Sequence, residues 1–198
     1  MSKRDLGTRP LLAGTALVAC LGLGLSQAQA AAAAHASRLG TAGAELDQLH
    51  SLTIENHALE LQQRQLTNQL DWQVSQGRSG AGVEAVADRL QALSKADGAL
   101  LEQEAGLARR IDGQLAGHVP PHLDTKLATI TTEIGQNHAV DRREQMVVNR
   151  VDWRLSNARP LGTTEADIDG LQHLSAKSNS FGRTEERMTG RVDQQLEP

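Results

Sequence analysis

Polar side chains that could bind a metal or pair through hydrogen bonds recur at matching places in four segments of the chain. One set comprises Asn56, Asp97, Asn137 and Ser178, and a second comprises Gln63, Glu104, Glu144 and Glu185. Carboxylates and imidazoles inside a helical bundle can hold iron or manganese, and His57 and His138 directly follow two members of the first set. Such di-metal sites use Glu-x-x-His pairs, however, and the sequence contains none. We therefore expect no metal or other cofactor, and interpret both sets as polar core layers that select helix register.

The composition of each layer depends on the direction of the helices that carry it. If neighbouring helices are antiparallel, the first set in segments one and three meets the second set in segments two and four. The predicted layer contains Asn56, Glu104, Asn137 and Glu185. A layer of this kind costs stability but restricts which helices can pair, so it favours a role in protein assembly.

Two tryptophans occupy equivalent positions, each directly after an aspartate. Trp72 and Trp153 should lie at the same pole of a helical structure. One interpretation is an aromatic contact patch for a partner protein or ligand; the other is that each indole closes one end of the core. We favour the second interpretation.

Catalytic motifs are missing from the sequence. There is no G-x-S-x-G elbow, and the Gly-rich stretch 77–82 lacks the Lys-Ser/Thr pair of a phosphate-binding loop. The single cysteine, Cys20, lies in the N-terminal segment discussed below. We expect the protein not to be an enzyme.

An internal repeat organises the rest of the chain. Shifting the sequence by 81 positions aligns NHALELQQRQLTNQLDWQVSQ (56–76) with NHAVDRREQMVVNRVDWRLSN (137–157), and 21 of 72 ungapped pairs are identical. A shift of 40 or 41 positions also matches many residues. The sequence therefore predicts a fourfold repeat of about 40 residues, with units near 38–78, 79–118, 119–159 and 160–198.

Each unit combines a stretch of helix breakers with a long periodic stretch. The breakers are LGTAG (39–43), GRSGAG (77–82), GHVPP (117–121) and ARPLGT (158–163). Between them, apolar residues recur at intervals of three, four and seven, as on one face of a helix. The four predicted stripes are Leu49, Leu52, Leu59, Leu66 and Leu70; Leu90, Leu93, Leu100, Leu107 and Ile111; Ile130, Val140, Val147 and Val151; and Leu171, Leu174, Phe181, Met188 and Val192.

These patterns predict an all-α fold of four long helices. Aromatic residues make up only 2% of the chain, which argues against a β-sandwich or barrel. Short connections between long helices favour an antiparallel, coiled-coil-like four-helix bundle. Two helical hairpins that pair with another chain, or an extended solenoid, are the alternatives.

The N-terminus has the three parts of a secretory signal peptide. Basic residues in 1–10 precede an apolar run over 11–25 and the small-residue triplet 28–30. We predict cleavage after Ala30, then an Ala/Gly-rich linker over 31–44 and a helical domain over 45–198. Lipid attachment at Cys20 and an uncleaved anchor are the alternatives.

The charge balance limits the classes of partner that the protein could bind. The chain has 20 Lys and Arg against 24 Asp and Glu, a net charge of −4, which argues against nucleic-acid binding. We expect an exported, periplasmic, non-enzymatic helical protein that acts through a protein partner or self-association, as a scaffold, envelope-assembly subunit or chaperone-like binder. Membrane contact is expected only through the signal peptide or a lipidated Cys20, which would make it a lipid-anchored envelope protein. The alternative function is a small-molecule- or metal-binding bundle that uses the polar layers.

Overall fold

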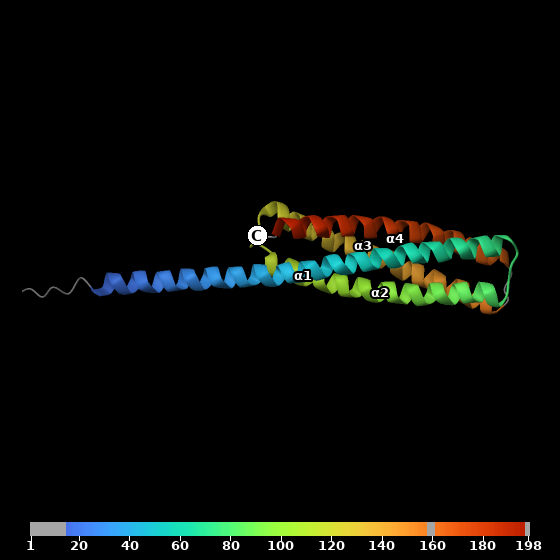
Figure 1. Ribbon diagram of the computed structural model, residues 1–198, viewed down its shortest axis with the longest axis horizontal. Helices are drawn as coiled ribbons and strands as arrows, with labels where there is room; N and C mark the ends of the chain where they lie inside the picture. Colours follow the sequence, from blue (N-terminus) through green and yellow to red (C-terminus); the bar gives the residue numbers. More distant parts are fainter. Residues whose placement is uncertain (1–14, 158–160, 197–198) are drawn as a thin grey trace, which may run out of the picture.

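Four helices account for the part of the chain that the computed structural model describes, residues 15–157 and 161–196. They are α1 (Thr15–Ser75), α2 (Ala81–Leu115), α3 (Pro121–Ser156) and α4 (Leu161–Leu196). Consecutive helices run in opposite directions and lie side by side (Figure 1). The predicted all-α four-helix bundle is confirmed; the fourfold repeat stays a prediction from the sequence.

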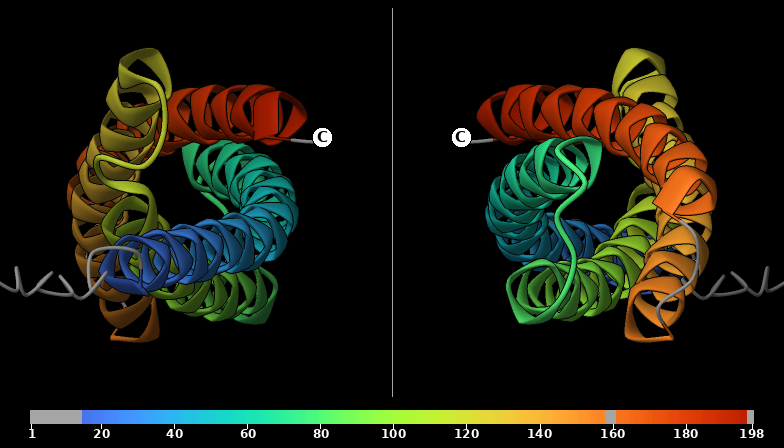
Figure 2. Two further views of the ribbon diagram at one scale, coloured as in Figure 1. Left: turned by 90° about the vertical axis from the view of Figure 1, so that its left-hand side faces the viewer. Right: turned by 90° about the vertical axis from the view of Figure 1, so that its right-hand side faces the viewer.

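The helices form a square array with a simple up-down-up-down order. α1 packs against α2 and α4, and α3 packs against the same two helices, so α1 and α3 are diagonal to each other (Figure 2). Within the described ranges, no helix combines the length and the hydrophobicity of a membrane span.

The connections lie where glycine and proline predicted them. Gly77, Gly80 and Gly117 have φ values of +66°, +94° and +70°, which side chains with a Cβ rarely adopt. Pro121 is the first residue of α3, where the missing N–H costs no hydrogen bond. The breaks near 77–82 and 117–121 are thus confirmed. Of the last breaker, ARPLGT (158–163), residues 158–160 lie outside the described residues and 161–163 begin α4.

The first expected breaker is wrong, because LGTAG (39–43) lies inside α1. This helix has 61 residues, and its N-terminal part extends well beyond the other three (Figure 1). Ala42 and Leu46 are fully buried against the other helices, and this packing outweighs the cost of about 1 kcal/mol for each glycine within the helix. Residues 31–44 are therefore helical, and no irregular linker separates them from the bundle. Residues 1–14 of the predicted signal peptide lie outside the described residues.

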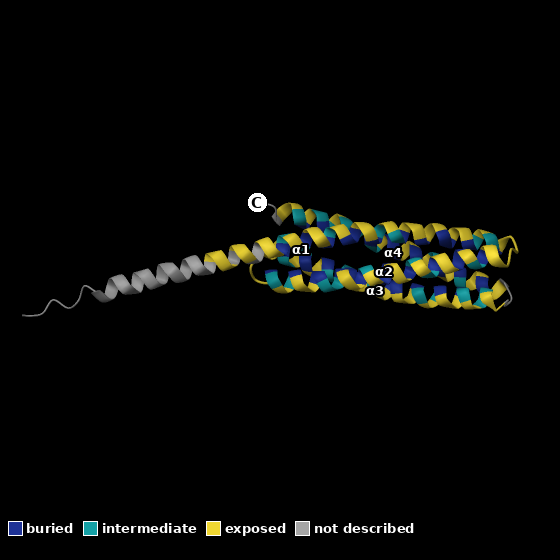
Figure 3. Ribbon diagram, turned by 60° about the horizontal axis from the view of Figure 1, so that its bottom comes forward, coloured by how far each residue is buried: buried dark blue, intermediate teal, exposed yellow. Residues whose placement is uncertain are grey.

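Two apolar clusters fill the ends of the bundle, and its middle is mainly polar. One cluster includes Leu49, Ile111 and Ile130, and the other, at the opposite pole, includes Leu70, Val151 and Ile168. Buried positions nevertheless continue along the whole bundle, from Ala42 onward in α1 and along the other three helices (Figure 3). Most of the residues buried in the middle are polar, with Leu101 and Val140 as apolar exceptions.

The buried stripe differs from the predicted one in this middle part. In α1 it follows a 3-4 alternation through Ala42, Leu46, Leu49, Thr53, Asn56, Glu60, Gln63, Thr67, Leu70 and Val74. The predicted seam residues Leu59, Leu93, Leu100, Val147, Leu174, Phe181 and Met188 are only partly buried, at its edge. A helix is rigid, so once its two apolar ends are buried, the residues at 3-4 spacing between them are buried as well.

Candidate functional site: an acidic centre

Six carboxyl groups lie in the middle of the bundle, and all four helices contribute to them. We call this group the acidic centre; it comprises Glu60 of α1, Asp97 and Glu104 of α2, Asp141 and Glu144 of α3, and Glu185 of α4. None of these side chains is more than 1% exposed. Ion pairs with lysine or arginine are absent from this group within the described residues. A buried charge without a partner is very unfavourable, so burial favours the protonated, neutral form of these carboxyls.

Burial is the main cause that raises the pKa of every member of the acidic centre. The pKa is about 9 for Glu104, about 8 for Glu60, Asp97 and Glu144, about 7 for Glu185 and about 6 for Asp141. Repulsion between the carboxylates adds to this effect: Glu185 and Glu60 both raise the pKa of Glu104. The centre is thus largely protonated and neutral at pH values at which surface carboxyls are ionised.

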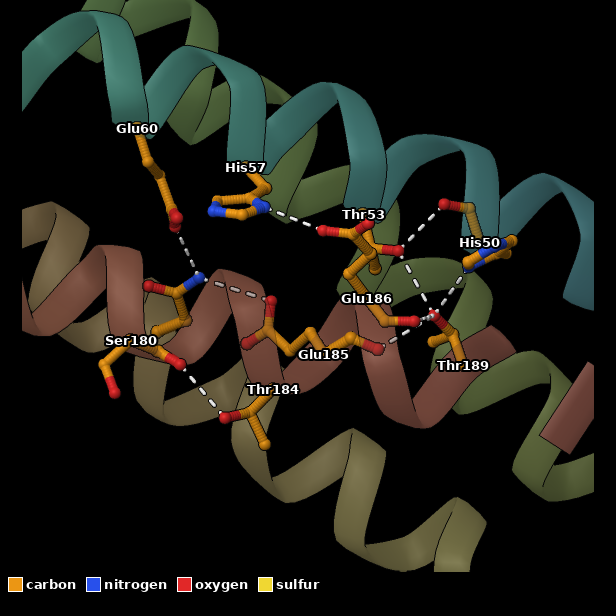
Figure 4. A network of polar contacts seen from close by, with 10 residues as sticks. His50, Thr53, His57, Glu60, Ser180, Thr184, Glu185, Glu186 and Thr189 are labelled. Carbon is orange, nitrogen blue, oxygen red and sulfur yellow. Dashed lines mark hydrogen bonds and ion pairs between the residues drawn. The ribbon is translucent and has the colours of Figure 1, made fainter. Parts of the chain in front are cut away.

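Asn137 connects three helices within the centre. Its Nδ2 donates to Glu60 Oε1 at 3.0 Å and to Glu185 Oε2 at 3.3 Å, and Glu60 and Glu185 face each other across this amide (Figure 4). Ser178 Oγ lies 3.0 Å from Glu60 Oε1 and 2.9 Å from Asn137 Oδ1. These bonds join α1, α3 and α4 in the mainly polar middle of the bundle.

Other polar groups of the centre have no such bonds. Both carboxyl oxygens of Glu104 and Glu144, and both amide atoms of Asn56, lack a hydrogen-bond partner among the described residues. A buried polar group without a partner costs about 1–3 kcal/mol. The centre is therefore a weak point of the closed bundle.

The eight residues predicted as polar layers are all buried: Asn56, Gln63, Asp97, Glu104, Asn137, Glu144, Ser178 and Glu185. Of the predicted layer, the structure joins Asn137 to Glu185 but leaves Asn56 without a partner. The second acceptor of the Asn137 amide is Glu60, which the sequence analysis missed.

Glu60 and Asp141 are the two carboxyls that sequence reasoning overlooked. A signal was present, because the 81-residue shift that defines the repeat aligns these two acids with each other. Glu60 also lies four residues after Asn56, on the same face of a helix. The spacing of the apolar residues assigned the neighbouring Leu59 to the core, so Glu60 was not considered as a core residue.

The two histidines near the polar layers do not join the carboxyls of the centre. The His57 Nδ1 atom lies 2.7 Å from Glu186 Oε2, on the partly exposed side of the α1–α4 contact (Figure 4). Partial burial and the nearby Arg142 lower the pKa of His138. In the described part of the chain, no three His, Cys, Asp or Glu side chains are grouped as metal ligands.

The two tryptophans lie at the same pole, near the C-terminal ends of the diagonal helices α1 and α3. Trp72 is 52% exposed and Trp153 is 51% exposed, so the expectation that each indole closes the core is wrong. Leucine, valine and isoleucine side chains fill that end of the core instead. The Trp72 ring lies 4.5 Å beneath the Arg78 guanidinium, which keeps one of its faces covered.

Comparisons of the chain with models of protein families, with curated proteins and with solved structures gave no match.

Proposed function

We propose that this protein is an exported, non-enzymatic helical protein that acts through protein–protein contacts, as a scaffold, envelope-assembly subunit or chaperone-like binder. The observation that carries the proposal is the acidic centre. Two apolar ends hold the helices together, while the middle buries carboxyls such as Glu104 and Glu144 without hydrogen-bond partners. A second chain that supplies amide or basic side chains to this region would relieve that cost.

Exposed apolar side chains offer first contacts for such a partner. Ile54, Leu61 and Met146 are 46%, 40% and 59% exposed, in addition to Trp72 and Trp153. Ile54 and Leu61 are seven residues apart and therefore lie on the same outer face of α1. The signal peptide predicted from the sequence supports a periplasmic location for these contacts.

A test of self-association uses the chain from Ala31 onward, beside the full chain as its reference. Unlabelled and isotope-labelled chains are mixed and analysed by native mass spectrometry, and thermal unfolding is followed by circular dichroism over a hundredfold concentration range. We expect mixed oligomers and a Tm that rises with concentration. A monomeric mass with a high, concentration-independent Tm would overturn self-association, and binding assays with envelope proteins would then test a foreign partner.

The alternative function is a metal- or small-molecule-binding bundle, and the unpartnered buried oxygens of Glu104 and Glu144 favour it. Metal titration separates the two. A rise in Tm with Mn²⁺ or Fe²⁺ that a chelator reverses would support the metal-binding bundle. A Tm that neither treatment changes is the result that the proposed contact function predicts.

A further inference from the structure

A groove between α1 and α4 is lined mainly by cationic and imidazole groups. It has a volume of about 390 Å³, and its walls include His50 of α1 and Arg183, Arg187 and Arg191 of α4. It lies on the outside of the bundle and is separate from the acidic centre.

The three arginines form a regular ladder along α4. They are four residues apart, so their Cα atoms are spaced by about 6 Å and their side chains lie on one face. All three are exposed, and within residues 15–157 and 161–196 none has an ion pair with a carboxylate. Their charges are available to a ligand.

The neighbouring imidazole is held in one orientation. The Thr189 hydroxyl donates to the Glu185 carbonyl at 2.8 Å, so it accepts the hydrogen bond from His50 Nδ1 at 3.1 Å (Figure 4). This bond assigns the proton of the neutral ring to Nδ1, so Nε2 accepts from a protonated phosphate oxygen, or donates to a phosphate when the ring itself is protonated. Gly190 makes room for the ring, since a Cβ there would lie 3.0 Å from His50 Cε1.

The carboxylate that lines this groove is already engaged. Glu186 accepts from His57 Nδ1 at 2.7 Å, which reduces its competition for the arginines. The overall charge opposes anions less than the sequence suggests. Of the 24 acidic residues, four of the acidic centre (Glu60, Asp97, Glu104 and Glu144) are buried with pKa values of about 8 to 9, which leaves 20 against 20 Lys and Arg.

We propose that the α1–α4 groove binds a ligand that carries two or three consecutive phosphate groups, as a free oligophosphate or as neighbouring headgroups of an anionic lipid surface. Planar guanidinium groups bind phosphate oxygens in pairs. Three arginines on one helix face, with Cα atoms about 6 Å apart, can converge through their long side chains on linked phosphate groups. This site does not depend on the proposed protein–protein contacts, so either proposal can fail alone.

A second groove, between α2 and α3, provides an internal control. It has a volume of about 510 Å³ and is lined by Arg109, Arg142, His138 and Glu102. The 81-residue shift aligns its Glu102 with Arg183 of the first groove. Each groove is lined by one glutamate, so the second groove differs in having two arginines where the α1–α4 groove has three.

The test is isothermal titration calorimetry of the full chain with inorganic triphosphate, and with orthophosphate for comparison. We expect triphosphate to bind, with orthophosphate binding at least tenfold more weakly because it reaches one step of the ladder. Arg187→Gln should weaken triphosphate binding about tenfold, as expected for the loss of a charge-assisted hydrogen bond. Arg183→Glu, which copies the control groove, should weaken binding further, while circular dichroism shows an unchanged helix content.

The matched control carries Arg109→Gln and Arg142→Gln in the α2–α3 groove and should bind triphosphate like the unchanged chain. Equal losses in both grooves would mean that the charge acts non-specifically and would overturn the proposal. Flotation with phosphatidylglycerol vesicles, against phosphatidylcholine vesicles, distinguishes the two sources of phosphate. Binding that Arg187→Gln abolishes supports the lipid source; no binding to triphosphate or to vesicles overturns the site.

Discussion

The two ends of the bundle and its centre are buried to the same degree but are built from different residues. Leu49 and Leu70 at the two ends are 0% exposed, and so are Asp97, Glu104 and Glu144 in the centre. At the ends, burial of apolar surface stabilises the fold; in the centre, the same burial removes carboxyls from water and opposes folding unless they bind protons. Burial in this protein therefore depends on the continuity of long helices and not on the residue type at each position.

The largest expected effect is the dependence of the free energy of unfolding on pH. The unfolded carboxyls titrate near their ordinary values of 3.8 and 4.5, whereas in the folded protein these pKa values reach about 6 to 9. Between these limits the folded state binds more protons, so stability decreases as pH rises. Urea unfolding followed by circular dichroism from about pH 5 to about pH 9 should show a falling midpoint, and a midpoint that rises would contradict the acidic centre.

A substitution within the centre checks the cause of that dependence. Glu104→Gln keeps the size and polarity of the side chain but cannot ionise, so folding no longer requires a proton at this position. We expect a shallower fall of the urea midpoint above about pH 7 and a protein more stable than the unchanged chain at about pH 9. The exposed Glu55→Gln is the control and should leave the pH profile as it is.

At the ends of the bundle, truncation of apolar side chains should have the next largest effect. Leu49→Ala and Leu70→Ala each remove a fully buried side chain from an apolar cluster. We expect a loss of about 2–5 kcal/mol in the free energy of unfolding at either end. The partly buried Leu59, next to the centre, should tolerate alanine with a loss well below that of Leu49, as measured by urea unfolding at fixed pH.

The amide of Asn137 should contribute less than an apolar end residue but more than a surface residue. Asn137→Ala removes the donor to both Glu60 and Glu185, and we expect a loss of about 1–3 kcal/mol. Because the two carboxyls lose a hydrogen bond that favours their ionised form, their pKa values should rise. NMR titration of the carboxyl carbons measures that shift, and unchanged titration would show that the amide does not stabilise them.

Substitution of two glycines within helices should give smaller changes in stability, of opposite sign at the two positions. In Gly182→Ala the new Cβ would lie 3.0 Å from the Glu60 carboxyl carbon, and we expect a loss of about 1–2 kcal/mol because Glu60 must move. In Gly106→Ala the nearest atom is Arg110 Nη1 at 3.7 Å, so the better helix propensity of alanine should stabilise the protein by up to about 1 kcal/mol. Urea midpoints of the two variants should move in opposite directions.

The sequence by itself determined the fold class and the positions of the turns between α1 and α2 and between α2 and α3. Gly77, Gly80 and Gly117 mark turns because their backbone needs positive φ, and the 3-4 spacing of apolar residues selects helices over strands. The polar residues at Asn56, Glu104, Asn137 and Glu185 were recognised as core positions because they continue that spacing. These features depend on residues that are close together in the sequence, so they can be read without knowledge of the tertiary structure.

Only the tertiary structure decided which helix face is buried in the middle of the bundle and whether the carboxyls there are protonated. The LGTAG stretch stays helical because Ala42 and Leu46 pack against other helices, which local propensity does not express. Glu60 replaces Leu59 in the core because the two apolar ends fix the rotation of α1 over its whole length. The protons on the acidic centre are likewise a collective property, since a pKa depends on how completely the other three helices exclude water from each carboxyl.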